Sequence, residues 1–171
     1  MIFAIFAHKF ITTMKKALLL VLVATSLFTL RSSAQSMGSS YETALGVKFW
    51  PGAISIKHFI SGNNALEGLA NFWDRGFRFT GLYEIHGDIN DVEGLKWYVG
   101  PGAHLGWYNG NYYHDHYYES GALSIGVDGV LGLDYKFNGA PIAVSLDVQP
   151  YLEFNHVYLG VWGGLGVRYT F

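Results

Sequence analysis

The stretch that decides the fold is residues 120–137, which read SGALSIGVDGVLGLDYKF. From Leu123 to Leu133 every second residue is apolar or glycine, while the positions between them include Ser124 and Asp128. Successive side chains of a β-strand point to opposite faces, so this pattern predicts a strand with one apolar and one polar face. No apolar pattern with helical spacing is long enough beyond residue 34 to predict a helix.

The same alternation recurs along the chain. Residues that favour turns, such as Pro51-Gly52 and Asn138-Gly139, separate the alternating segments. Strands are predicted at 41–50, 53–60, 65–73, 77–86, 95–108, 120–137, 141–155 and 157–171. Strands of about 9–11 residues are the length that crosses a bilayer in a β-barrel.

The two faces of these strands differ sharply. One face is apolar and aromatic, as at Leu131 and Leu146. The other face carries six basic and six acidic residues: Lys48, Lys57, Glu67, Arg78, Glu84, Lys96, Asp128, Asp134, Lys136, Asp147, Glu153 and Arg168. Either the apolar face fills a soluble, lipocalin-like ligand-binding barrel, or it contacts lipid and the charges lie inside.

Two features favour the membrane arrangement. Only 14% of the residues are charged, against about 25% in an ordinary soluble domain. Aromatic residues gather at strand ends, as in an interfacial girdle: Trp50, Trp97, Trp107, Tyr108, Tyr135, Phe137, Tyr151, Tyr158 and Trp162. We therefore predict an all-β fold, an eight-stranded antiparallel up-and-down transmembrane β-barrel.

An eight-stranded barrel has an interior just wide enough for side chains. The twelve charged residues of the polar face are therefore expected to pair with one another and to plug the lumen, because an unpaired buried charge is costly. A narrow channel remains an alternative. Eight polar-face glycines either leave room for the charged chains or allow strand curvature: Gly46, Gly100, Gly102, Gly106, Gly126, Gly132, Gly164 and Gly166.

The first 34 residues have the layout of a cleavable secretory signal peptide. Lys15 and Lys16 precede an apolar stretch at 17–30, and small residues at 32–34 form a cleavage site. The apolar run is shorter than the roughly 20 residues that a membrane anchor needs. Residues 1–13 are either an over-extended start before Met14 or part of a longer signal. The predicted domains are a signal peptide at 1–34 and a barrel at 35–171.

Composition excludes several classes of protein. The formal net charge is −2, and the basic residues of the first 34 positions have no acidic counterparts there, so the barrel domain is more acidic still. A nucleic-acid partner normally requires a basic face, and none is predicted. The absence of cysteine excludes disulfide scaffolds and thiolate metal sites.

The last eight residues, GLGVRYTF, resemble the C-terminal signal of Gram-negative outer-membrane proteins. The matching positions are Leu165, Val167, Tyr169 and Phe171. The resemblance implies recognition by the barrel assembly machinery. Segments such as 94–100 and 126–133 are similar to small eight-stranded outer-membrane barrels, including the barrel half of outer-membrane protein A. This implies a place in the outer membrane among its lipids, with a structural or surface-interaction role.

With an even number of strands, both termini of such a barrel lie in the periplasm, and the segment at 109–119 becomes the longest extracellular loop. Tyrosine offers a large amphipathic contact area, so the loop is a candidate surface for a partner: Tyr112, Tyr113, His114, His116, Tyr117 and Tyr118. Two histidines are too few for a structural zinc site, and no metal or other cofactor is predicted.

Catalysis is the weaker alternative. Enzymatic outer-membrane barrels such as lipid A deacylases use a serine activated by a histidine that a carboxylate holds. His104, Ser124 and Asp128 are the residues on the polar face that fit these roles near the outer rim. The deacylase-type His-x-Ser on one strand is absent, because Leu105 and Gly106 follow His104. The prediction is therefore a protein without enzymatic activity.

Overall fold

Eight β-strands make up the regular structure. The computed structural model describes residues 38, 40–73, 76–108, 122–155 and 157–171. The strands are β1 (Thr43–Phe49), β2 (Ala53–Ser61), β3 (Asn64–Trp73), β4 (Gly76–Asp88), β5 (Leu95–Tyr108), β6 (Ala122–Lys136), β7 (Ile142–Glu153) and β8 (Tyr158–Thr170). The predicted boundaries differ from these by at most two residues. The predicted signal peptide and the loop at 109–119 lie outside the described residues.

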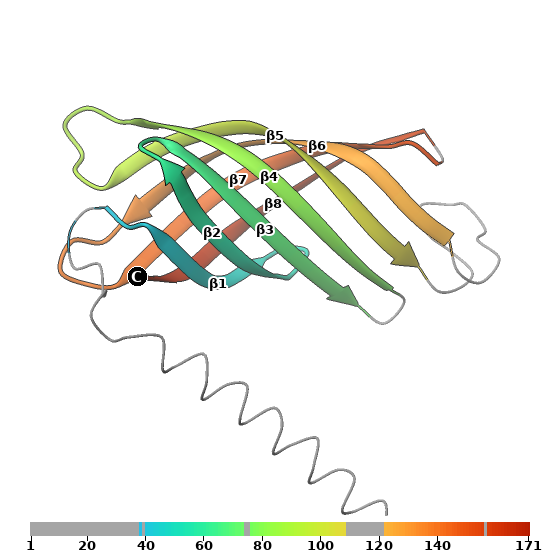
Figure 1. Ribbon diagram of the computed structural model, residues 1–171, viewed down its shortest axis with the longest axis horizontal. Coiled ribbons are helices and arrows are strands. Elements are labelled where there is room, and N and C mark those ends of the chain that lie inside the picture. The colour runs from blue at the N-terminus through green and yellow to red at the C-terminus, as the bar shows by residue number, and fades with distance from the viewer. Residues whose placement is uncertain (1–37, 39, 74–75, 109–121, 156) are drawn as a thin grey trace, which may run out of the picture. The chain divides into compact units, whose positions relative to one another are not determined.

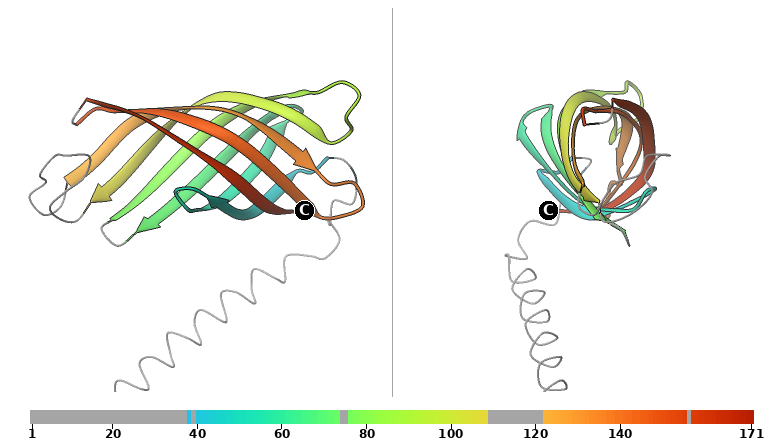
Figure 2. Two further views of the ribbon diagram at one scale, coloured as in Figure 1. Left: turned by 180° about the vertical axis from the view of Figure 1, so that it is seen from behind. Right: turned by 90° about the vertical axis from the view of Figure 1, so that its right-hand side faces the viewer.

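The strands close into a barrel (Figure 1). Each strand pairs antiparallel with the next in the chain, and β8 returns to pair with β1, where Leu45 lies opposite Tyr169. The end-on view in Figure 2 shows the closed ring of strands. The prediction of an all-β, eight-stranded, antiparallel up-and-down barrel is confirmed.

The barrel has two ends, which the strand directions define. The near end carries the start of β1, the C-terminus and the β2–β3, β4–β5 and β6–β7 connections (Figure 1). The far end carries the turn at 50–52 between β1 and β2 and the connection between β7 and β8. Since β1 has 7 residues and β6 has 15, the wall is much lower over β1 than over β6.

The faces of the barrel are inverted relative to a water-soluble protein. Large apolar side chains point outward along every strand, and Leu146 keeps 60% of its surface exposed. Charged side chains point inward, and Arg78 and Glu84 are 0% exposed. The lipocalin-like alternative needs the apolar face inside the barrel and is therefore wrong for this chain. Within the described residues, no helix is long and apolar enough to cross a membrane.

Four of the aromatic residues expected in an outer girdle lie elsewhere, and one of them, Tyr158, lies opposite the inward Glu153. Tyr108 and Tyr151 are buried, and the ring of Trp162 packs on the buried guanidinium of Arg78. These residues share the strand parity of inward-facing neighbours, since Tyr151 lies two residues from Glu153. Aromatic character at a strand end therefore misled the prediction, while parity along the strand indicates the correct face.

Candidate functional site

The barrel interior collects the charged residues of the polar face. Eleven of the twelve are buried, and they come from seven strands: Lys48, Lys57, Glu67, Arg78, Glu84, Asp128, Asp134, Lys136, Asp147, Glu153 and Arg168. Lys96 is the exception, because it is the second residue of β5 and lies at the near end. Its Nζ lies 2.6 Å from Oδ1 of Asp88, whose side chain is 71% exposed, so this pair belongs to the rim.

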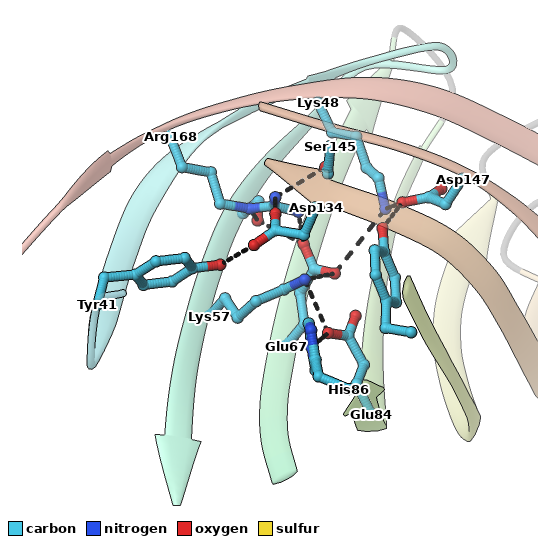
Figure 3. A network of polar contacts seen from close by, with 12 residues as sticks. Tyr41, Lys48, Lys57, Glu67, Glu84, His86, Asp134, Ser145, Asp147 and Arg168 are labelled. Carbon is cyan, nitrogen blue, oxygen red and sulfur yellow. Dashed lines mark hydrogen bonds and ion pairs between the residues drawn. The ribbon is translucent and has the colours of Figure 1, made fainter. Parts of the chain in front are cut away.

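Arg168 organises the first part of the interior, which we call the central cluster: Lys48, Lys57, Glu67, Glu84, Asp134, Asp147 and Arg168. Its guanidinium donates to Glu67, to Ser55 Oγ at 2.7 Å and to Ser145 Oγ at 2.8 Å. Ser55 in turn donates to Oε1 of Glu67 at 2.6 Å. Figure 3 shows that these side chains converge from opposite sides of the barrel.

Two lysines complete the ring around Glu67. Lys57 Nζ lies 2.7 Å from Oε2 of Glu84, and Lys48 Nζ lies 2.6 Å from Oδ2 of Asp147 (Figure 3). Both ammonium groups are also 3.9 Å from Oε2 of Glu67. Glu67 is therefore the carboxylate that three buried cations share.

Neutral side chains fill the space between the charges. The hydroxyl of Tyr98 donates to Asp147 at 2.5 Å, and its ring lies 4.1 Å from Lys57 Nζ. His86 stacks on the same ring at 5.0 Å and places Nε2 2.9 Å from Glu84. The prediction missed Tyr98 and His86, although both share the parity of charged neighbours on their strands.

Tyr41 closes the central cluster from outside the strands. It precedes β1, and its hydroxyl donates to Oδ2 of Asp134 at 2.6 Å while its ring meets Phe59 edge-on at 5.1 Å. Burial and the neighbouring Asp134 carboxylate raise the pKa of the Tyr41 phenol well above its usual range. Residue 41 begins the predicted strand at 41–50 but has the parity of the apolar face, so the sequence pattern does not indicate this inward contact.

Lys136 serves the near end of the barrel rather than an ion pair. Its Nζ donates to the backbone carbonyls of Gly38, Phe137 and Ala140, each at 2.8 Å. These bonds tie the residues before β1 to the β6–β7 turn. A small cavity of about 50 Å³ remains beside Lys136 and Tyr41.

A second group of charges, the far cluster, surrounds Arg78. Its Nη2 donates to Oδ1 of Asp128 at 2.7 Å, and Nη1 lies 3.9 Å from Glu153. The guanidinium also packs on two aromatic rings, with centroids at 4.5 Å for Tyr151 and 4.1 Å for Trp162. Arg78 is thus held by charge and by cation–π contact together.

The three candidate catalytic residues lie in and beside this far cluster. His104 Nδ1 lies 2.7 Å from Oδ2 of Asp128, so the structure brings these two together. Ser124 is buried on the neighbouring strand, but among the described residues neither its hydroxyl nor Nε2 of His104 has a hydrogen-bond partner. Nη2 of Arg78 also lies 2.8 Å from Nδ1 of His104, so the histidine belongs to an ion cluster.

The inward glycines serve both of the purposes considered above. A Cβ on Gly132 would lie 2.6 Å from Cζ of Tyr98, and a Cβ on Gly166 would lie 3.2 Å from Nη1 of Arg168, so these two make room for side chains. A Cβ on Gly46 would instead overlap the backbone carbonyl of Val167 on β8, so Gly46 allows close strand approach.

The outer surface has a groove and an exposed C-terminal strand. An apolar groove of about 570 Å³ crosses β1 to β5, and its lining residues include Ile56, Leu105, Gly68 and Gly81. The four residues of the C-terminal motif are all exposed on the outside of the barrel: Leu165, Val167, Tyr169 and Phe171.

Other candidate residues lie outside the described ranges. The loop positions fall within 109–121: Tyr112, Tyr113, His114, His116, Tyr117 and Tyr118. Among the residues that the structure does describe, no group of three or more His, Asp or Glu side chains is arranged to hold a metal ion.

Comparison with known proteins adds no relative. No protein-family model matches the chain, no curated protein matches it, and no solved structure matches it.

Proposed function

We propose that this chain is an exported outer-membrane β-barrel with a lumen plugged by paired charges, and that its role is structural or surface interaction rather than catalysis. The signal peptide at 1–34 directs export, and residues 35–171 form the barrel. The observation that carries the proposal is the inversion of the faces, with large apolar side chains exposed outside and charged side chains buried inside.

The exposed apolar surface favours lipid as the surroundings. In water, a contiguous apolar patch beyond a few hundred Å² normally marks an interaction surface. Here the apolar side chains line every strand, and exposed examples such as Ile54, Phe79 and Leu131 lie on different sides of the ring. Only surroundings that enclose the whole barrel cover such a surface, and a bilayer does so.

The contacts inside the barrel support a plugged lumen. Glu67, Lys57 and Arg168 are at most 1% exposed, and they bond across the interior from three different strands. An ion that crosses must break these contacts and leave buried charges unpaired, which costs several kcal/mol. A narrow channel is therefore the less favoured reading.

The C-terminal motif and the long outer loop supply the partners in this proposal. Tyr169 at the end of β8 and Phe171 just after it are exposed, where the barrel assembly machinery can reach them. The tyrosine-rich loop at 109–119 is the proposed contact surface for an extracellular partner.

Heat-modifiability tests the proposal. The protein without residues 1–34 is refolded in detergent and run on a gel, either unheated or boiled. A closed membrane barrel resists the gel detergent when unheated and migrates differently after boiling. No shift, together with solubility in buffer without detergent, would overturn the proposal.

A second candidate, a hydrolase, has one observation in its favour. His104 is oriented by Asp128 at 2.7 Å, as a general base is in a catalytic triad. An ester-hydrolysis assay on the refolded barrel decides between the two. Turnover that Ser124→Ala abolishes, while Ser145→Ala retains it, would establish the hydrolase. We expect no turnover from the unsubstituted protein.

A further inference from the structure

The charges of the central cluster do not balance. It contains four carboxyl groups and three cations, all of them buried: Glu67, Glu84, Asp134, Asp147, Lys48, Lys57 and Arg168. Lys136 does not restore the balance, because it donates to three backbone carbonyls and forms no ion pair with a carboxylate of the described residues. An uncompensated buried charge is costly, so this count indicates that one of the four carboxyl groups carries a proton.

Glu84 has the least support for a negative charge among the four. Its Oε2 lies 2.7 Å from Nζ of Lys57 and 2.9 Å from Nε2 of His86. Each of the other three carboxyl groups is near a cation and also accepts a hydrogen bond from a hydroxyl group: Glu67 from Ser55, Asp134 from Tyr41 and Asp147 from Tyr98. Within the described residues Glu84 accepts no such bond, and it shares Lys57 with Glu67. The extra proton is therefore expected on Glu84.

A hydrogen bond between two carboxyl groups locates this proton. The side chains of Glu84 and Glu67 bond to each other, and Figure 3 shows both carboxyl groups beside Lys57. An ionised carboxylate only accepts hydrogen bonds, so this contact requires a proton on one of the two groups. Oε1 of Glu84 and Oε2 of Glu67 are buried and have no other hydrogen-bond partner among the described residues, so they are the oxygens available for it. Three cations surround Glu67 and keep it ionised.

The alternative holder of the proton is His86. Its Nε2 already faces Glu84, so a second ring proton would be on Nδ1, which has no hydrogen-bond partner in the part of the chain that the structure describes. A protonated ring would also place a second cation close to Lys57. Tyr98, which stacks on His86, donates its hydroxyl hydrogen to Asp147. Both rings are therefore neutral neighbours of Glu84.

We propose that Glu84 is a proton-binding site of the barrel interior, which at neutral pH holds a proton on Oε1 and donates it to Oε2 of Glu67. Three carboxylates then face three cations, and the central cluster is neutral. Loss of the proton leaves two ionised carboxylates in contact, with Lys57 as the cation that they share. Like charges in contact repel each other, so an alkaline medium weakens the contacts that fill the lumen. This inference depends on the closed interior and not on what surrounds the barrel.

Glu84→Gln tests the site, because glutamine imitates the protonated acid. Its amide oxygen remains an acceptor for Lys57, and its amide nitrogen donates to Glu67 without titrating. Asp88→Asn, which removes an exposed carboxylate at the rim, is the matched control. Infrared difference spectra of the refolded barrels at neutral pH should show that Glu84→Gln lacks a carbonyl band of a protonated carboxylic acid that the natural chain and Asp88→Asn share. No such difference between the natural chain and Glu84→Gln refutes the proposal.

The pH dependence of unfolding gives an independent test. Glutamate in an unfolded chain ionises near about pH 4.3, so folding at neutral pH takes up one proton at Glu84. Stability from this proton is complete at low pH and is lost as the pH rises, with about a tenfold fall in the folding constant per pH unit. In urea unfolding between about pH 6 and pH 8, the natural chain and Asp88→Asn should show this slope relative to Glu84→Gln. Equal slopes for the three chains, or strong destabilisation of Glu84→Gln at neutral pH, would contradict the inference, whereas the heat-dependent gel shift of the natural chain tests the membrane proposal separately.

Discussion

Glu67 is the carboxylate on which the central cluster depends most, and Glu67→Gln is the sharpest perturbation of it. The substitution keeps the size of the side chain and removes one charge. It leaves Arg168 without the carboxylate to which its guanidinium donates, and Lys48 and Lys57 each lose a second carboxylate at 3.9 Å. Asp134 at 3.6 Å from Arg168 is too distant to replace Glu67 as a hydrogen-bond acceptor.

The expected loss of stability is large because both side chains of the ion pair are buried. Glu67 and Arg168 are each 1% exposed, so water does not solvate the cation that remains. Breaking a buried ion pair by removing one partner costs about 3–5 kcal/mol. Glu67→Gln combined with Arg168→Met removes both charges, and the pair should lose less than the sum of the two single changes.

The assay is reversible urea unfolding of the barrel in liposomes, followed by tryptophan fluorescence and by the gel shift. Asp88→Asn is the matched control, because its pair with Lys96 lies at the rim and an exposed pair contributes only about 0.2–1 kcal/mol. If Glu67→Gln destabilises the barrel no more than Asp88→Asn does, or if the double variant is simply additive, the reasoning about the central cluster is wrong.

Three further predictions concern other parts of the barrel. Gly132→Val should destabilise the barrel by about 1–3 kcal/mol in urea, because its Cβ would crowd Tyr98, whereas Gly81→Ala adds a methyl group into open space and should be neutral. Tyr41→Phe should cost about 1–3 kcal/mol near neutral pH by leaving Asp134 one donor short. Since folding raises the pKa of Tyr41, its contribution is complete below about pH 10 and is lost as the pH rises further, so pH titration of unfolding should show a smaller alkaline loss in Tyr41→Phe. Leu131→Arg, outward on β6, should lower stability in liposomes by up to about 2–4 kcal/mol, and an unchanged midpoint would argue against lipid contact there.

The strands and their faces were predictable because the period-two pattern is a direct consequence of strand geometry. In β6 the sequence alternates between residues such as Ile125 outside and Asp128 inside, and the structure keeps this register. Closure of the ring was also predictable, since eight alternating segments with short turns leave two free edges that a barrel removes.

The pairing inside the barrel was not predictable, because parity identifies a face and not a partner. Arg168 meets Glu67, about 100 positions away in the chain, only because β8 and β3 lie across a narrow lumen. Lys96 shares the parity of inward residues but is the second residue of its strand, so its side chain lies at the rim of the barrel instead. Whether an inward side chain is buried or lies at the rim depends on how far the neighbouring strands extend, and that depends on the register of all the strands.

The difference in height between β1 and β8 also explains why the part of β8 before Leu165 pairs with β7 and not with β1. The sequence indicates that 41–50 is a shorter segment than 157–171, but only the register shows that β1 ends opposite Leu165. Trp162 lies in this part of β8, and its ring contacts the ring of Trp73 on β3 and the guanidinium of Arg78 instead of joining an outer girdle.

The central claim is that lipid covers the apolar face and that the charged face is inside. Single cysteines along β6 carry a spin label, one position at a time, and its collision rates with oxygen and with a water-soluble nickel complex are measured in liposomes. We expect contact with oxygen at positions 125, 127, 131 and 133, and protection from both reagents at 124, 128 and 134. Contact with the nickel complex at the first four positions, in a protein that stays in the aqueous phase, would contradict it.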